Sequence, residues 1–198
     1  MSPHPAPVDY GVILWRGRPE PTALFTAWDV FWIPFSLGWT GGLVAGTISA
    51  ARAAAPAPVY LVLGIMLAMG CYLMVGRFVV KSRINRRTTY VITDSHAIIE
   101  QGGSAEARLL EPKLIRMRRQ LFGGRVTVDF EAPLHGYRGP LAVIYVAYAN
   151  TGMDFVIPAA TGGWIPFRFY DVADQEGLMT ALRRAGIDLR DRANTPSR

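Results

Sequence analysis

Two long apolar stretches occupy the first half of the chain. The first runs from about residue 27 to 50 and the second from about 59 to 80. A helix of about 20 apolar residues crosses a bilayer core, so both stretches have the length of a membrane span. Two buried helices of a soluble core would be the alternative, but two such runs in succession favour the membrane. The pattern predicts a transmembrane helical hairpin over residues 27–80.

Beyond residue 88 the apolar positions recur with a period of two. Val126 and Val128, for example, alternate with Thr127 and Asp129. Runs of this kind lie at residues 90–93, 98–99, 109–110, 115–118, 126–130, 142–148, 153–157 and 164–169. Short runs separated by glycine turns are typical of antiparallel strands. We expect a sandwich or barrel of about seven strands.

One amphipathic helix is expected after the strands. Apolar residues recur at helical spacing from Val172 to Ala185, Asp171 is a suitable N-cap, and Gly186 is placed to end the helix. About seven strands closed by a C-terminal helix is the arrangement of a pleckstrin-homology (PH) domain. The predicted class is therefore a two-helix membrane hairpin joined to an α+β domain.

These patterns divide the chain into four parts. The expected parts are an N-terminal cytoplasmic segment over residues 1–26, the hairpin over 27–80, a PH-like domain over 81–190 and a polar tail over 191–198.

Basic residues near the two spans predict their orientation. Arg16 and Arg18 precede the first span, and the connecting loop carries only Arg52. The residues that close the second span are Arg77, Lys81, Arg83, Arg86 and Arg87. Loops rich in Lys and Arg stay in the cytoplasm, so we expect a multi-pass protein of a bacterial inner membrane with both termini inside. Four of these juxtamembrane residues are also expected to attract anionic headgroups, by about 1 kcal/mol each, namely Lys81, Arg83, Arg86 and Arg87.

The formal net charge of +6 belongs to the part of the chain from residue 77 onward. Basic residues are densest in one short region, which contains Lys113, Arg116, Arg118, Arg119 and Arg125. One interpretation is a solvated sheet face, and the other is a surface for anionic lipid heads or an acidic protein. Nucleic acid is not expected as a partner, because no recognition motif is present.

Small residues follow one face of the first span. Gly38, Gly42 and Gly46 stand four apart, and Gly64 and Ala68 form a shorter pair in the second span. Small residues allow another helix to approach closely. The two spans could pack together through these residues, or the face could dock to another membrane protein. Both interpretations stay open at this point.

No arrangement of residues indicates catalysis. The three histidines are scattered without metal-ligand spacing, and the single cysteine, Cys71, allows neither a disulfide framework nor a zinc site. Nucleophile motifs, phosphate loops and dinucleotide fingerprints are also missing from the sequence. We therefore expect no enzyme, cofactor, metal or small-molecule substrate.

Several segments together resemble a family of bacterial integral membrane proteins with a PH-like domain. The segment Leu-Trp-Arg-Gly-Arg-Pro at residues 14–19 resembles its opening, and Gly76-Arg77-Phe78 followed by residues 86–94 resembles its "GRF…RRTxYxLTDxR" segment. Residues 167–172 resemble the closing motif. The ordered set covers most of residues 11–185.

The resemblance has two departures and limited functional content. His96 stands near the position where the family often has Arg, and residues 131–163 match no pattern of the family. The resemblance implies a PH-like fold and a membrane location. It implies no activity, because most members of the family are uncharacterised, and a fold by itself does not supply a function.

These features predict a non-catalytic, membrane-tethered interaction module. It would bind a protein partner or anionic lipid headgroups at the cytoplasmic membrane face, through the basic region around Arg116. The alternative is an accessory or assembly subunit of a larger inner-membrane complex. Such a subunit would dock through the glycine-rich face of the first span.

Overall fold

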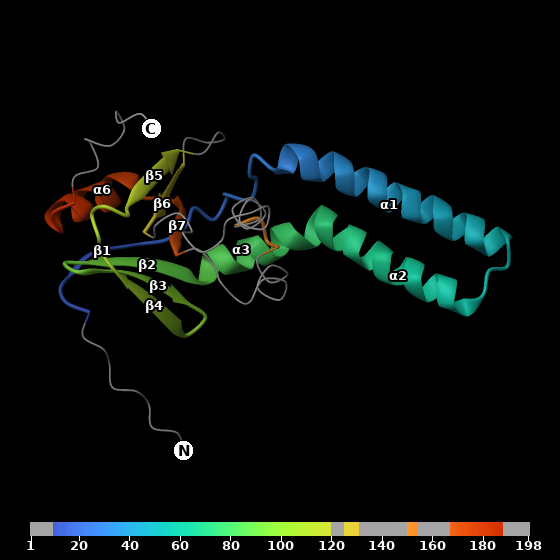
Figure 1. Ribbon diagram of the computed structural model, residues 1–198, viewed down its shortest axis with the longest axis horizontal. Helices are drawn as coiled ribbons and strands as arrows, with labels where there is room; N and C mark the ends of the chain where they lie inside the picture. Colours follow the sequence, from blue (N-terminus) through green and yellow to red (C-terminus); the bar gives the residue numbers. More distant parts are fainter. Residues whose placement is uncertain (1–9, 120–124, 131–149, 154–166, 188–198) are drawn as a thin grey trace, which may run out of the picture.

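The structure is a computed structural model that describes residues 10–119, 125–130, 150–153 and 167–187. Its strands are β1 (Ile13–Gly17), β2 (Thr88–Thr93), β3 (His96–Gln101), β4 (Ser104–Leu109), β5 (Arg116–Arg119), β6 (Val126–Asp129) and β7 (Arg168–Val172). Its helices are α1 (Asp29–Arg52), α2 (Ala57–Cys71), η1 (Tyr72–Gly76), α3 (Arg77–Arg87) and α6 (Gln175–Arg184). The strands gather at one end of the molecule, and a long helical hairpin projects from them (Figure 1).

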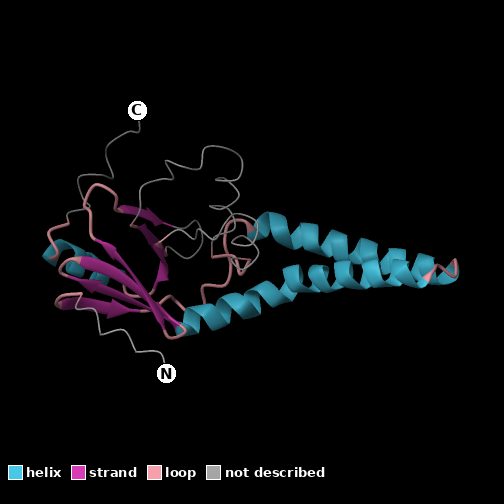
Figure 2. Cartoon of the chain, turned by 60° about the horizontal axis from the view of Figure 1, so that its bottom comes forward, coloured by secondary structure: helices cyan, strands magenta, loops and turns pink. Residues whose placement is uncertain are grey.

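The hairpin consists of α1 and of α2 continued through η1 into α3. The helices α1 and α2 run side by side (Figure 2). They approach closely at Gly70, where an added Cβ would lie 2.5 Å from the hydroxyl oxygen of Thr40. The indole nitrogen of Trp39 lies 3.5 Å from the carbonyl oxygen of Met66. The contact between the two helices is therefore centred on Gly70 of α2 and the middle of α1.

One helical stretch in the described residues, Ala57–Arg87, is long and apolar enough to cross a membrane. Only 6% of its apolar window is buried inside the molecule, unlike the core helix of a soluble protein. The helix α1 has 24 residues but does not reach the same apolar content. Its four glycines, two serines and two threonines explain the difference. By this criterion the structure supports one of the two expected spans.

The strands form two antiparallel sheets, with the orders β1-β2-β3-β4 and β5-β6-β7. The sheets are joined along one side, because the chain beyond β1 pairs with the end of β7. Ala173 donates its backbone N–H to the Arg18 carbonyl at 3.2 Å, and Glu20 donates to the Asp171 carbonyl at 2.7 Å. The described strands do not close into a barrel, since β4 and β5 remain outer strands. The structure therefore shows two joined antiparallel sheets with a helix, and it does not show the closed PH-like barrel expected from the sequence.

The strand β1 lies before the hairpin in the sequence, yet it pairs with β2, which follows the hairpin. Arg16 is opposite Val91, and Gly17 is opposite Tyr90. The expected division between an N-terminal segment of residues 1–26 and a domain of residues 81–190 thus cuts through one sheet. The hairpin is an insertion between two neighbouring strands.

The core lies between the two sheets and α6. Its fully or nearly fully buried large side chains include Trp15, Tyr90, Ile92, Ile115, Phe130, Phe167, Phe169, Leu178 and Leu182. The rings of Tyr90 and Phe169 stack with centroids 4.4 Å apart. Burial raises the pKa of the Tyr90 hydroxyl well above its usual range. That hydroxyl bonds to the Tyr170 backbone, donating to its carbonyl at 3.2 Å and accepting from its N–H at 3.0 Å.

The expected C-terminal helix is present, but its N-cap is Asp174 and not Asp171. The Asp174 carboxylate accepts from the Gly177 N–H at 2.9 Å and from the Trp15 indole N–H at 2.9 Å. Asp171 belongs to β7, where its side chain is fully buried. At the other end, Gly186 has φ +80° and ends the helix as expected. Ile187 then donates to the Leu182 carbonyl at 2.9 Å, which closes the helix terminus.

Some expectations lie outside the described residues. These are the strand expected at 142–148, residues 154–157 of the one expected at 153–157, most of the unmatched segment 131–163, and the tail 191–198. The strand expected at 164–169 is described only from residue 167, and its end coincides with the start of β7.

Replacing Asp174 with Ala should destabilise the sheet domain by about 1–2 kcal/mol, because the N-cap and the bond to Trp15 are lost together. Asp174→Asn, which still caps, should cost less. The two hydrogen bonds lower the pKa of the Asp174 carboxyl. The carboxylate therefore stabilises the fold above its ordinary pKa, and this contribution is lost as the pH falls through the lowered value. Unfolding of the detergent-solubilised proteins can be followed by Trp fluorescence. The difference in free energy of unfolding between the parent protein and Asp174→Asn should shrink as the pH falls. A gap independent of pH would contradict this assignment.

Candidate functional site

Charged and polar side chains are buried where the hairpin meets the sheets. We call Asp29, Arg77, Lys81, Asn150 and Asp171 the junction cluster. Arg77 forms an ion pair with Asp29, with side-chain exposures of 1% and 5%. The Nε of Arg77 also donates to the Leu73 carbonyl at 2.7 Å. Since Asp29 begins α1 and Arg77 begins α3, this ion pair joins the two helices at the base of the hairpin.

The second ion pair of the junction cluster connects α3 to β7. The Lys81 Nζ lies 3.5 Å from Asp171 Oδ2 and donates to the Leu24 carbonyl at 3.3 Å. The same Asp171 oxygen accepts from the Asn150 side-chain amide at 2.8 Å. Asp171 has φ +49°, in the left-handed region that most residues avoid. Such a backbone conformation persists only where surrounding contacts hold it, and here the contacts come from Lys81 and Asn150.

The periodicity of α3 explains why these charges are buried. Arg77, Lys81 and Asn85 recur every four residues and are all buried. Residues four apart share a helix face, so this face of α3 turns into the molecule. Lys81 was expected to attract headgroups, and that expectation is wrong, because its side chain is buried against Asp171. Arg77, which belongs to the same juxtamembrane set, is likewise enclosed in an ion pair with Asp29.

The remaining basic residues of α3 lie on its exposed side. They are Arg83, Arg86 and Arg87. None of them forms an ion pair with another residue in the described part of the chain. The juxtamembrane basic set is therefore two groups, one buried and structural and one free to meet an anionic surface.

A fourth segment contacts α3 beside the junction cluster. Gly152 has φ +82° and packs so tightly that an added Cβ would lie 2.1 Å from the carbonyl oxygen of Arg77. The Tyr72 hydroxyl in η1 donates to the Gly152 carbonyl. Residues 150–153 thus belong to the same contact as α1, α3 and β7. They belong to the segment 131–163, for which the sequence indicated no partner within the chain.

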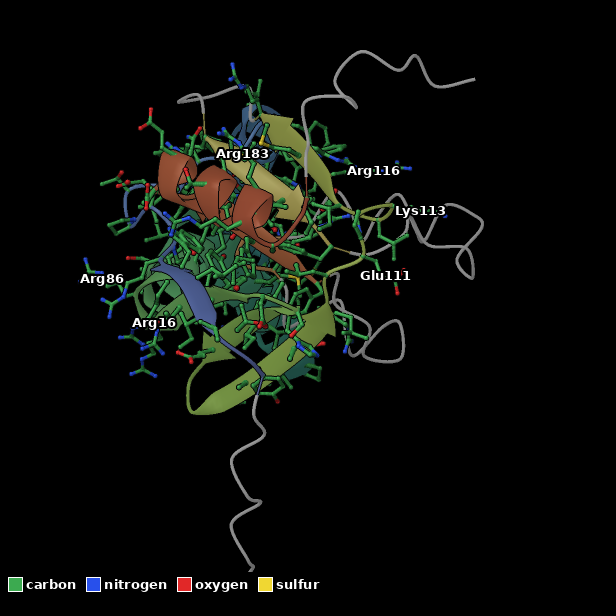
Figure 3. All side chains as sticks on the ribbon, turned by 90° about the vertical axis from the view of Figure 1, so that its left-hand side faces the viewer. Arg16, Arg86, Glu111, Lys113, Arg116 and Arg183 are labelled. Atoms are coloured by element: carbon green, nitrogen blue, oxygen red, sulfur yellow. The ribbon has the colours of Figure 1, made fainter. Side chains whose placement is uncertain are left out.

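The basic strand β5 forms an outer edge of the second sheet. Lys113 and the β5 residues Arg116, Arg118 and Arg119 are all exposed, as expected for a surface. Arg118 pairs with Asp129 at 3.1 Å, so part of its charge is compensated. Arg116 and Lys113 project from the side of the domain opposite Arg16 and Arg86 (Figure 3).

Arg125 does not share the exposure of that surface. Its side chain is partly buried, and its Nη1 atom is enclosed. We therefore define the basic β5 surface as Lys113, Arg116, Arg118 and Arg119 only.

The small residues expected to pack the two helices together do not do so. A Cβ added at Gly38, Gly42, Gly46 or Gly64 would have no atom within 4 Å. Ala68 is exposed as well. The interpretation that these residues pack one span against the other is therefore corrected, since the close approach uses Gly70 instead. The glycine face remains an open surface of the hairpin.

No cluster of three or more potential metal ligands occurs among the described residues. Comparison of the chain with protein-family models, with curated proteins and with solved structures finds no match. The resemblance to bacterial PH-like membrane proteins consequently stays a prediction. Function has to be argued from the surfaces and contacts of the chain itself.

Replacing Arg77 with Met should destabilise the protein by about 3–5 kcal/mol, because Asp29 would be left buried without its partner. Replacing both residues, as Asp29→Leu with Arg77→Met, should recover much of that loss, since no uncompensated charge remains. Denaturant unfolding in one detergent measures both variants. A single variant as stable as the parent, or a double variant no better than the single, would contradict the assignment.

Proposed function

We propose that the chain is a non-catalytic interaction module tethered to the cytoplasmic face of a bacterial inner membrane. The hairpin would be the anchor, and the PH-like domain would bind an acidic partner protein. The proposal is supported by the exposed faces of the hairpin, the pairing of β1 with β2, and the basic β5 surface.

The hairpin exposes large apolar side chains along both helices. They include Val30, Phe31, Phe35, Leu37, Val44, Ile48, Val59, Leu61, Val62, Ile65 and Met69. Soluble monomers rarely expose apolar surfaces of this extent, whereas a bilayer would cover them. The hydroxyls of Ser36 and Thr47 donate to the carbonyls of Ile33 and Leu43 within α1. Such internal bonds suit a helix without access to water and support α1 as the second span.

The position of β1 supports the proposed topology. Because β1 pairs with β2, the chain must enter and leave the hairpin on the same side of a membrane. The exposed Arg83, Arg86 and Arg87 lie on that side, and the hairpin turn carries only Arg52. The distribution of positive charge favours the cytoplasm for the domain.

The arrangement of the domain supports a PH-like assignment. Seven strands lie in two antiparallel sheets, and the C-terminal helix α6 packs Leu178, Ala181 and Leu182 into the core between them. Among the described residues, backbone hydrogen bonds join the sheets on the β1–β7 side. PH-like domains commonly act as binding modules, so the fold is compatible with the proposed role without proving it.

The observation that carries the proposed binding role is the exposure of β5. All four of its residues are exposed, and β5 pairs only with β6 within the described part of the chain. An extended segment of a partner could therefore add to this edge by backbone hydrogen bonds while its acidic side chains meet the arginines. A lipid headgroup could use the charges but not the backbone edge. The geometry thus favours a protein partner.

Removing charge from the basic β5 surface should release that partner. We expect Arg116→Gln combined with Arg119→Gln to weaken partner binding by about 100-fold or more, and so to abolish co-purification from native membranes in mild detergent, because charge-assisted contacts contribute about 1.5–3 kcal/mol each. The matched control is Arg183→Gln with Arg184→Gln on α6, which removes the same charge elsewhere and should retain the partner. Equal recovery by both double variants would contradict the proposal. Retention on anionic vesicles alone, without a protein, would assign the surface to lipid.

A second candidate function is that of an accessory or assembly subunit docked through α1. It is favoured by the open space beside Gly38, Gly42 and Gly46, which no contact within the described chain uses. Small residues at such a face would allow another transmembrane helix to approach closely.

Filling the glycine face should separate the protein from such a complex. Gly42→Leu with Gly46→Leu inserts side chains where a partner helix would lie, and we expect the complex to dissociate on native gels. Val44→Leu with Ile48→Leu, at exposed positions of the same helix, introduces the same residue type with almost no added volume and should leave the complex intact. Unchanged migration of the glycine variant would rule out docking through this face.

A further inference from the structure

A basic groove opens where β1 ends and β2 begins. Its volume is about 550 Å³, and it is lined by Arg16, Gly17, Arg18 and Thr89. It lies on the opposite side of the domain from the basic β5 surface, since Arg16 and Lys113 project in opposite directions (Figure 3). The groove is therefore separate from the surface assigned to the protein partner.

The side chains at the groove are hydrogen-bond donors with little compensating negative charge. Arg16 pairs with Glu100, and its side chain is still 57% exposed. Arg18 forms no ion pair with another residue in the described ranges. Arg86, in the last turn of α3 and three residues before Thr89, projects on the same side as Arg16 (Figure 3). Guanidinium groups and a hydroxyl are the side chains that hold phosphate oxygens.

The floor of the groove is rigid, and its backbone is already paired. An added Cβ at Gly17 would lie 2.1 Å from the Trp15 ring, so this position needs glycine for the close approach. The chain here pairs with β2 on one side, and the Arg18 carbonyl accepts from Ala173 on the other. No free strand edge is left for a peptide to pair with. Recognition must come from the side chains, which favours a compact anion.

We propose that this groove binds the phosphate groups of a small phosphorylated molecule. Pockets of about 300–1,000 Å³ suit small ligands, and the groove falls in this range. Arg16 and Arg18, together with the Thr89 hydroxyl across from them, would hold a phosphate or diphosphate by charge-assisted hydrogen bonds. The sequence contains no phosphate loop, so such a site would depend on the folded contact of β1 with β2.

The height of the groove favours a ligand from the aqueous phase over a bilayer phospholipid, an argument that rests on the proposed membrane placement. The pair of Arg77 with Asp29 marks the base of the hairpin. From Arg77 to Arg87, α3 rises roughly 15 Å at 1.5 Å per residue. The headgroup layer on each side of the hydrocarbon core is only about 5–8 Å thick. The phosphates of ordinary phospholipids would therefore lie below the groove.

The test uses the full-length protein in neutral phosphatidylcholine nanodiscs, with inorganic pyrophosphate as the probe in calorimetric titration. We expect saturable binding that Arg18→Glu weakens by about tenfold or more, because a charge-assisted contact becomes a repulsion. Arg116→Glu makes the same charge change on the basic β5 surface and should alter the dissociation constant by less than about twofold. Absence of saturable binding, or equal weakening by both variants, would overturn the proposal.

A second arm distinguishes the source of the phosphate. Repeating the titration in nanodiscs that contain phosphatidylglycerol should change pyrophosphate binding far less than Arg18→Glu does, because the groove lies about 7–10 Å above the headgroup layer, which is roughly one Debye length of about 8 Å. Competition by phosphatidylglycerol would show that the groove holds lipid phosphate, and it would overturn the assignment to a soluble ligand. Neither result depends on the basic β5 surface, so the proposed partner binding stands or fails separately.

Discussion

The fold depends on two ion pairs that are buried at one place, Arg77 with Asp29 and Lys81 with Asp171. Charges removed from water have to be paired closely, and losing one partner costs several kcal/mol. The four residues come from the start of α1, from α3 and from β7. Their pairing therefore fixes how the hairpin stands on the sheets. Asn150 adds a contact from a further segment by donating to Asp171.

Such pairs need not be more stable than an apolar contact of the same size. What they provide here is a defined position, because each charge accepts only a neighbour of opposite sign. The left-handed backbone of Asp171 shows that the strand end adapts to that requirement. With β1 paired to β2 on the other side of the hairpin, the domain is held at two points. A domain held in this way would present the basic β5 surface and the groove at Arg18 at constant heights above a membrane.

Several features could be predicted from the sequence because they are local. The period of two located β2, β5 and β6, and the helical spacing after residue 171 located α6 with Gly186 at its end. The strand β1 was missed because Ile13–Gly17 is a five-residue segment without clear alternation, and its partner lies beyond the hairpin. Two acidic residues precede α6. Asp174, directly before Gln175, caps the helix, whereas Asp171 lies in β7 and pairs with Lys81.

The candidate site was harder to predict than the fold, because the charge and size of a residue do not show whether its side chain points into the molecule or toward its surface. Counting basic residues near a span could not separate the buried Arg77 and Lys81 from the exposed Arg83. The acidic Asp29 at the start of an apolar run was a signal that one of these basic residues forms an ion pair. The spacing of Gly38, Gly42 and Gly46 likewise could not show that the helix contact uses Gly70.

The central claim is that a membrane hairpin is inserted into one sheet, so that both of its ends lie on the same side of the membrane. Single cysteines at Arg18, Ala54 and Arg119, in a Cys71→Ala background, test this directly with a membrane-impermeant thiol reagent on sealed vesicles of known orientation. The account predicts that Arg18→Cys and Arg119→Cys are labelled from the same side and Ala54→Cys from the opposite side. Labelling of Arg18→Cys and Arg119→Cys from opposite sides, or of all three from one side, would contradict it.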